Sequence, residues 1–430
     1  MMHVSARELG SRLRELVPSN PKQRPVDDAL WFDYYAGYAD EFVAGVLMAI
    51  EDAVGTVLDP WNGAGTTTAV AARSGLSAVG LDVNPAAAVI AKARLLRSDV
   101  ADSLQPLADD ILGHARARRD VPSETDLLPR WLAPASAARI RRLERSVAQL
   151  LVPDAERTTF DAERLSSLAA LFYLALFRTV RELLQPFFAS NPTWMRLRVE
   201  PADRVEIGFA ALADRFRHNV AFLRAAVARN AYPARVALPQ IKVASSSAIP
   251  LDSGSVDAVV TSPPYCTRID YAVATLPELA ALGFAWPDVT QLRTQLIGTP
   301  TMLRDSAGER GDDSVQLRRL LRRVERHGSY AARSYYLPFY RQYFDGMRRS
   351  MKELYRVARP GAPLVLVVQD SWFKDIPVKT PAIVNEMAES IGWSLVGEHH
   401  FDVKTRAAMH PHRARRRTSR ATETVTLLVR

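Results

Sequence analysis

Residues 58–67 read Leu-Asp-Pro-Trp-Asn-Gly-Ala-Gly-Thr-Thr, and this stretch indicates an α/β fold because it joins a strand to a helix. The apolar pattern predicts the strand over residues 56–59 and the helix over residues 66–73. Glycines in the connection allow the backbone to approach a ligand closely, at a helix N-terminus whose N–H groups are free. A nicotinamide dinucleotide fingerprint would require glycine where Thr68 stands, and a P-loop would require Gly-Lys-Ser/Thr. The stretch therefore predicts a cofactor loop of a different kind.

Acidic residues end the first two predicted strands. Asp59 ends the strand before the loop, and Asp82 ends a second strand predicted over residues 78–82. Asp82 follows Gly63 by about 20 positions, the spacing at which a carboxylate meets a ribose diol in folds of this kind. An acidic site also suits a cofactor with a sulfonium and an ammonium group better than one with phosphates. A tight turn with a capping acid is the alternative interpretation.

Strand and helix patterns alternate up to about residue 97 and return after a long helical stretch. Further strands are predicted over residues 241–244, 256–260, 364–368, 394–397 and 424–429. The stretch between, residues 98–235, has helical periodicity interrupted by prolines. We predict that residues 1–97 and 241–430 form one domain, and that residues 98–240 form a helical insertion that could recognise DNA.

A second motif, Thr-Ser-Pro-Pro-Tyr at residues 261–265, follows the apolar strand predicted over residues 256–260. Each proline fixes its own φ, and the first also restricts the serine before it to extended conformations. Ligands of open α/β sheets bind beyond the carboxyl ends of the strands, which is where this rigid hook lies. An ordinary turn that ends a strand is the alternative. The hook consists of Ser262, Pro263, Pro264 and Tyr265.

The loop, the second acid and the hook together resemble the motifs of the amino-group DNA methyltransferases, which methylate cytosine N4 or adenine N6 with S-adenosylmethionine. The resemblance covers residues 35–97 and 241–430, and it implies a Rossmann-like class I methyltransferase fold: α/β, with a mainly parallel seven-stranded sheet and an α-helical insertion. The hook residues would be catalytic. The cofactor-binding residues that the resemblance implies are Asp59, Trp61, Gly63, Gly65, Thr66, Thr67, Asp82 and Asn84. We expect the loop and the hook to lie side by side at one rim of one sheet.

The resemblance also implies roles for individual hook residues. Ser262 Oγ and a backbone carbonyl such as that of Pro263 would accept hydrogen bonds from the amino group, and Tyr265 would stack on a base rotated out of the duplex. Serine at the first hook position favours cytosine N4, while adenine N6 stays open. The family's aspartate before the catalytic strand, a cofactor adenine contact, is absent from Ala244-Ser245-Ser246-Ser247. Trp31, Tyr34, Tyr35 and Tyr38 match an aromatic segment that packs on the methionine moiety, or else belong to the core.

Positive charge predicts a nucleic-acid partner. The 430 residues carry a formal net charge of +9, which favours a polyanion, and we expect double-stranded DNA. A basic stretch before the last predicted strand is expected to contact phosphates, or else to be a solvated loop. Its DNA-binding candidates are Lys404, Arg406, Arg413, Arg415, Arg416 and Arg417. A second arginine run, residues 318–326, has helical spacing and could also lie along DNA.

Composition limits the remaining function classes. Cys266 is the one cysteine, which excludes an internal disulfide and a multi-cysteine metal site, so we expect a reducing compartment and no metal. From the sequence we also expect a cytoplasmic location and no membrane association. Cys266 could be a nucleophile, as in carbon-5 methylation, but packing is the expected role. An RNA base methyltransferase of related fold and a non-catalytic DNA-binding subunit are the alternatives. A restriction endonuclease or defence-system partner is compatible with the sequence.

Overall fold

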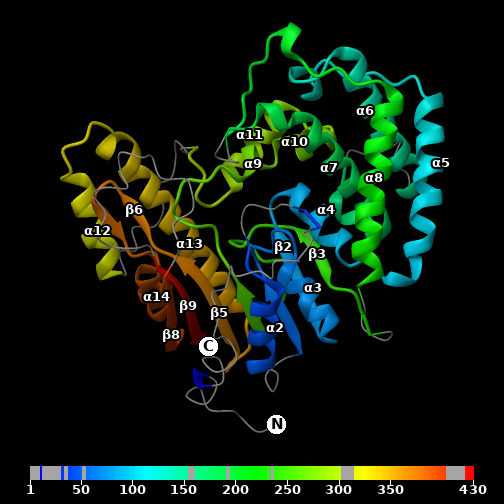
Figure 1. Cartoon of the computed structure of the whole chain (residues 1–430). Coiled ribbons are helices and arrows are strands. Elements are labelled where there is room, and N and C mark those ends of the chain that lie inside the picture. Colours follow the sequence, from blue (N-terminus) through cyan, green and yellow to red (C-terminus); the bar gives the residue numbers. More distant parts are fainter. Residues whose placement is uncertain are drawn as a thin grey trace.

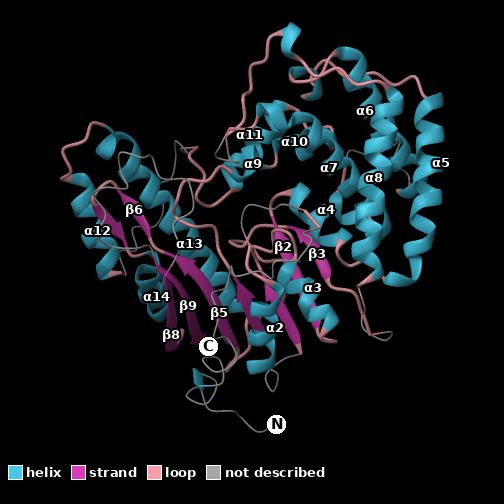
Figure 2. Ribbon diagram, viewed as in Figure 1, coloured by secondary structure: helices cyan, strands magenta, loops and turns pink. Residues whose placement is uncertain are grey.

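A seven-stranded sheet forms the centre of the protein, in the order β3-β2-β1-β4-β5-β9-β8 (Figures 1 and 2). The computed structural model describes residues 10–11, 31–32, 37–50, 55–153, 160–189, 194–230, 232–233, 237–301, 314–402 and 422–430. The strands are β1 (Thr56–Asp59), β2 (Ser77–Asp82), β3 (Gln240–Val243), β4 (Ala258–Thr261), β5 (Pro363–Gln369), β8 (Ser394–Asp402) and β9 (Thr422–Val429). The first five strands in this order run parallel, and β9 is antiparallel to both β5 and β8. The predicted Rossmann-like, mainly parallel methyltransferase fold is confirmed.

The central strands β1 and β4 are apolar on both faces, as helix-covered parallel strands must be. Val57 pairs with Ala258 and Leu58 pairs with Val259, and all four side chains are fully buried. Because the two strands are parallel neighbours, their carboxyl ends lie at the same rim. Asp59 and Thr261 end them, so the predicted adjacency of the loop and the hook is confirmed.

Helices cover both faces of the sheet. One face packs against α2 (Asp40–Ala49) and α3 (Thr66–Arg73), which bury Val46 and Ala71 with alternate side chains of the strands. The other face packs against α13 (Leu337–Val357) and α14 (Thr380–Ile391), which contribute Met347 and Ile383. Helix α4 (Pro85–Ala93), which comes after α3 and β2 along the chain, contacts β3.

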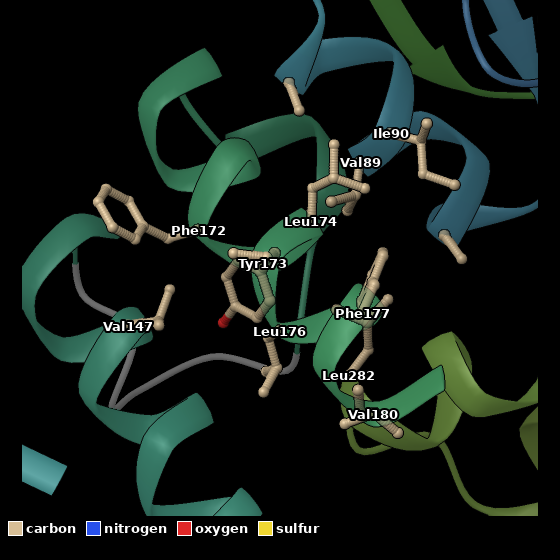
Figure 3. Close-up of a cluster of buried hydrophobic side chains, with 14 of the residues drawn as sticks. Val89, Ile90, Val147, Phe172, Tyr173, Leu174, Leu176, Phe177, Val180 and Leu282 are labelled. Carbon is tan, nitrogen blue, oxygen red and sulfur yellow. The ribbon is translucent and has the colours of Figure 1, made fainter. Parts of the chain in front are cut away.

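The helical insertion shares a core with the sheet domain. Its long helices are α5 (Leu104–Ala117), α6 (Pro134–Leu151), α7 (Ser167–Leu184) and α8 (Phe209–Ala228). The apolar middle of α7 is buried between Val89 of α4, Val147 of α6 and Leu282 (Figure 3). Removing the insertion would therefore expose one side of α4. As a separate point, no helix of the described residues is long and apolar enough to cross a bilayer.

Polar contacts also join the insertion to the segment after the hook, which folds into α9 (Tyr271–Ala274), α10 (Leu276–Ala281) and α11 (Trp286–Gln295). Arg181 of α7 donates two hydrogen bonds to the carboxylate of Glu278, at 2.8 and 2.7 Å, and Glu278 is fully buried. Arg141 of α6 donates to the carbonyls of Ala280 and Ala281, both at 3.0 Å. The insertion thus supports the chain that leaves the hook.

Several predicted boundaries change in the structure. The strand expected from residue 256 begins at Ala258, and Val256 forms only an isolated bridge with Ala358. A π-helical turn, Ala332–Tyr336, directly precedes α13. A small hairpin of β6 (Ser371–Phe373) and β7 (Ile376–Val378), and α12 (Val315–Glu325), complete the described elements near α13. Strands of three residues are too short for period-2 analysis to detect.

Candidate active site

The buried carboxylate of Asp59 fastens the loop to the hook. Its Oδ1 accepts hydrogen bonds from Thr261 Oγ1 at 2.6 Å and from the Trp61 amide at 3.1 Å. Its Oδ2 accepts from Thr67 Oγ1 at 2.6 Å and from the Tyr38 hydroxyl at 3.1 Å. Burial raises the pKa of Asp59, and the four donors oppose that rise. Both oxygens are occupied within the protein, so the geometry gives Asp59 a positioning role beside its predicted one.

The glycines of the loop are required for different reasons. Gly63 and Gly65 have φ of 49° and 81°, in the left-handed region that favours glycine. A Cβ on Gly65 would lie 2.7 Å from the Cβ of Ala91, so this glycine lets α3 begin against α4. The Gly63 amide instead donates to Asp82 Oδ2 at 3.0 Å. Gly63 therefore shapes the acidic side of the loop, and Gly65 shapes its packing.

Asp82 ends β2 beside the loop and is partly exposed. Besides Gly63, it accepts a hydrogen bond from the Asn84 amide at 2.9 Å. Burial raises the pKa of Asp82 to about 6, against these two hydrogen bonds, which lower it. Asn84 caps α4 through the Ala86 amide, and its Nδ2 donates to Thr275 Oγ1 at 2.8 Å. Asp82 is thus an accessible carboxylate held by backbone donors.

Exposure divides the predicted cofactor residues into two groups. Trp61, Gly63 and Asp82 are partly exposed at the rim and can contact a ligand directly. The buried members shape the loop from beneath: they are Asp59, Gly65, Thr66, Thr67 and Asn84. Of the aromatic segment, Tyr38 hydrogen-bonds Asp59 and Thr67 from within the core, while Tyr34 and Tyr35 lie outside the described residues.

Serines occupy the same rim at the end of β3. Ser245 and Ser247 are partly exposed, and their Oγ atoms lie 2.8 Å apart. The strand end is tied to β2, because the Ala244 amide donates to the Asp82 carbonyl at 3.2 Å. Hydroxyls therefore stand where the sequence lacked the family's aspartate, and they can both donate and accept.

The hook presents oxygen acceptors. Ser262 Oγ donates its hydrogen to the Val367 carbonyl of β5 at 3.0 Å. A serine hydroxyl has one hydrogen and two lone pairs, so the oxygen remains an acceptor. The Pro264 carbonyl is occupied by the Tyr343 hydroxyl at 2.8 Å, whereas no donor among the described residues reaches the Pro263 carbonyl. Ser262 and Pro263 therefore offer neighbouring acceptors.

Tyr265 is oriented by a residue that the sequence did not single out. Its hydroxyl donates to Glu423 Oε1 at 2.5 Å, and Glu423 is fully buried at the start of β9. Burial, and then the Glu423 charge, raise the pKa of Tyr265 well above its ordinary value, so the hydroxyl keeps its proton and donates. The Tyr265 side chain is partly exposed. The only signal for Glu423 was its place directly before the last predicted strand, residues 424–429.

The remaining candidates from the sequence are Cys266, a metal site and the basic stretch before the last strand. Cys266 is 3% exposed among apolar side chains of α13, and burial raises the pKa of its thiol far above the ordinary value. Its surroundings thus suit packing and oppose the thiolate that a nucleophile requires. No group of His, Cys, Asp and Glu in the described part of the chain is arranged to hold a metal. The basic candidates Lys404, Arg406, Arg413, Arg415, Arg416 and Arg417 lie outside the described residues.

Comparison with known proteins connects the chain to a methyltransferase. No protein-family model matches it. It is 28% identical over 149 residues to the Type II methyltransferase M.AvaI of Nostoc sp. (strain PCC 7120 / SAG 25.82 / UTEX 2576), and equally to the protein of that name from Anabaena variabilis. The match covers 32% of this chain and 31% of each relative, so the chain matches about a third of the length of these curated relatives.

Proposed function

We propose that the protein is a DNA methyltransferase that transfers a methyl group from S-adenosylmethionine to an exocyclic amino group of a base, with cytosine N4 favoured over adenine N6. One observation carries the proposal: the Asp59–Thr261 hydrogen bond, 2.6 Å long, joins an acidic cofactor loop to a hook of oxygen acceptors at neighbouring strand ends. The similarity to Type II methyltransferases supports the reaction class.

The residues at the rim fit the proposed cofactor. Asp82 is a partly exposed carboxylate that suits the ribose hydroxyls, and Trp61 offers a partly exposed aromatic surface at the same rim. The serines at Ser245 and Ser247 suit the polar edge of the adenine. When bound, S-adenosylmethionine supplies a methyl group on a positively charged sulfur, which an acidic site tolerates better than a basic one.

The hook would prepare the nucleophile. An exocyclic amino nitrogen is a poor nucleophile because its lone pair is delocalised into the ring. Ser262 Oγ, whose own hydrogen is held by Val367, can accept one amino hydrogen, and the Pro263 carbonyl can accept the other. Two acceptors on a rigid hook localise the lone pair and hold it in one direction, and such orientation supplies much of a catalytic acceleration.

Tyr265 would hold the target base. A base rotated out of the duplex loses a few kcal/mol of stacking and pairing, and stacking on an aromatic side chain returns about 1 to 3 kcal/mol. The bond to Glu423 fixes the ring before the base arrives. Tyr265→Phe would keep the ring and lose only this orientation, whereas Tyr265→Ala would lose both. We expect the alanine variant to lose more DNA methylation than the phenylalanine variant.

The test combines cofactor binding with product analysis. Purified protein is titrated with S-adenosylmethionine by calorimetry, then incubated with radiolabelled cofactor and either duplex DNA or tRNA. Digestion to nucleosides and mass spectrometry identify the product. We expect N4-methylcytosine in DNA. N6-methyladenine would select the adenine alternative, label in tRNA alone would select an RNA enzyme, and the absence of cofactor binding would refute methyl transfer.

A further inference from the structure

Helix α12 exposes a row of arginines beside the sheet. Leu317, Leu320 and Val324 are buried and face the protein. The opposite side is exposed, and we call it the arginine face. It consists of Arg319, Arg322, Arg323 and Arg326. Apolar residues at positions i, i+3 and i+7 fix the helix, so all four guanidinium groups point away from the core.

Few acids in the described part of the chain neighbour the arginine face, although Asp375, which pairs with His327, also interacts with the charge of Arg323. Among the described residues, its four arginines form no ion pair. Exposed arginines of the insertion differ: Arg217 pairs with Asp109 at 2.7 Å, and Arg224 pairs with Asp102 at 3.3 Å. Unpaired arginines retain their capacity to bind an external anion, whereas paired ones would first have to leave their acids.

Contacts connect the arginine face to the hook. Arg268, three positions after Tyr265, has a φ of 60°, which is uncommon for a residue with a side chain. Its guanidinium donates to the Tyr336 hydroxyl at 2.7 Å and lies 4.7 Å from the centre of that ring. Tyr336 belongs to the π-helical turn, and its ring packs on Phe373 with 4.6 Å between centroids.

The ring of Phe373 also contacts the end of α12. His327, directly after the arginine face, lies 5.0 Å from Phe373 between centroids. Tyr330, between His327 and the π-helical turn, is 99% exposed, and Arg333 in that turn is exposed as well. Unusual backbone at both Arg268 and the π-helical turn is a feature that often marks functional sites. Packed side chains therefore link the hook to the end of α12 through the buried ring of Phe373, and the exposed residues near this link include arginine and tyrosine.

We propose that the arginine face, Tyr330, Arg333 and Arg268 bind the phosphate backbone of duplex DNA next to the base that enters the hook. This inference rests on the proposed function and names its DNA-binding surface. Arginine fits phosphate through paired N–H donors, and phosphate contacts set the register of a protein on DNA. The insertion, on the opposite flank of the sheet (Figure 1), then serves as support for the chain after the hook.

The test compares two double variants of equal charge. Arg322→Gln with Arg326→Gln removes two unpaired arginines, and Arg217→Gln with Arg224→Gln removes two paired arginines of the insertion. Binding of each variant to a fluorescein-labelled duplex DNA is measured by anisotropy across a salt series. Each phosphate contact contributes about 0.9 to the slope of log affinity against log salt, so the α12 variant should lose up to about 2 from the slope. The insertion variant should retain the wild-type slope.

Equal losses in both variants, or a loss in the insertion variant alone, would overturn the inference. Arg322 and Arg326 lie near the C-terminus of α12, where a positive charge also favours the helix. Arg323 lies in the last turn as well, so thermal melting must show that each variant is folded, and a second variant, Arg319→Gln with Arg323→Gln, must show the same loss of slope. An unchanged slope in this second variant would count against the surface.

Failure of the proposed function can be distinguished. If the wild-type protein methylates DNA while the α12 variants bind DNA as tightly as it does, the function stands and the surface is wrong. If the α12 variants lose salt-dependent DNA binding but the wild-type protein itself transfers no methyl groups, the surface stands and the function is wrong. S-adenosylmethionine affinity should be the same in all variants, because their substitutions lie away from the loop.

Discussion

Lowering the pH from about 7 to about 5 should weaken S-adenosylmethionine binding about tenfold through Asp82. Burial raises the pKa of this carboxyl to about 6, so roughly nine tenths of it is ionised at about pH 7 and roughly one tenth at about pH 5. Ribose hydroxyls donate to an ionised carboxylate better than to a protonated one. If only the ionised form binds, the apparent Kd follows the ionised fraction.

Protonation of Asp82 has the opposite effect on the stability of the free protein: it raises the free energy of unfolding, whereas it lowers the affinity for the cofactor. The folded-state pKa lies above the ordinary value of 3.8. The stabilisation from a protonated Asp82 is therefore fully present below about pH 3.8 and is lost as the pH rises through about 6. Protonation of Asp82 thus stabilises the fold while it weakens cofactor binding, and the loss of affinity cannot come from unfolding through this group.

Calorimetric titration of the protein with S-adenosylmethionine at several pH values measures the effect. Asp82→Asn should bind more weakly at about pH 7 and show little change down to about pH 5. Asp370, at the end of β5, provides the matched control because burial raises its pKa to about 6 as well. Asp370→Asn should keep the wild-type pH dependence. A wild-type Kd that does not change with pH, or a dependence that disappears with Asp370→Asn, would refute the reasoning.

Three further predictions concern single residues. Ser262→Ala should lower kcat by about 100-fold to 1000-fold, the usual effect of removing one polar group that acts in the transition state, with cofactor Kd unchanged; a wild-type kcat would exclude Ser262 as an acceptor. Gly65→Ala should lower the free energy of unfolding by about 1 to 3 kcal/mol, because φ is 81° and the new Cβ would meet Ala91, and denaturant titration would show it. Arg181→Met should lower the free energy of unfolding by about 3 kcal/mol or more, because it leaves the buried carboxylate of Glu278 without its arginine partner. A Tm equal to that of the wild type would contradict this.

Local physics explains how far the sequence could be interpreted. The strand, glycine loop and helix around Gly63, and the rigid turn at Pro263, follow from β-branched runs, glycine φ freedom and fixed proline φ, which act over a few residues. Those features were sufficient to predict the α/β class and both halves of the candidate site. The short helices α9 to α11 and the β6–β7 hairpin were missed, because tertiary packing stabilises them more than periodicity does.

What the tertiary structure alone decided is which distant residues meet. Pairing of β4 with β1 brings Thr261 to Asp59, and pairing of β4 with β5 brings Ser262 to the Val367 carbonyl. The lengths of the intervening stretches of chain carry no signal for either pairing. Burial then separated the accessible carboxylate of Asp82 from the loop residues that only support it. The sequence by itself determined the chemistry that each segment can offer. Hydrogen bonding and exclusion of water in the folded chain determined which of those groups remain free to act.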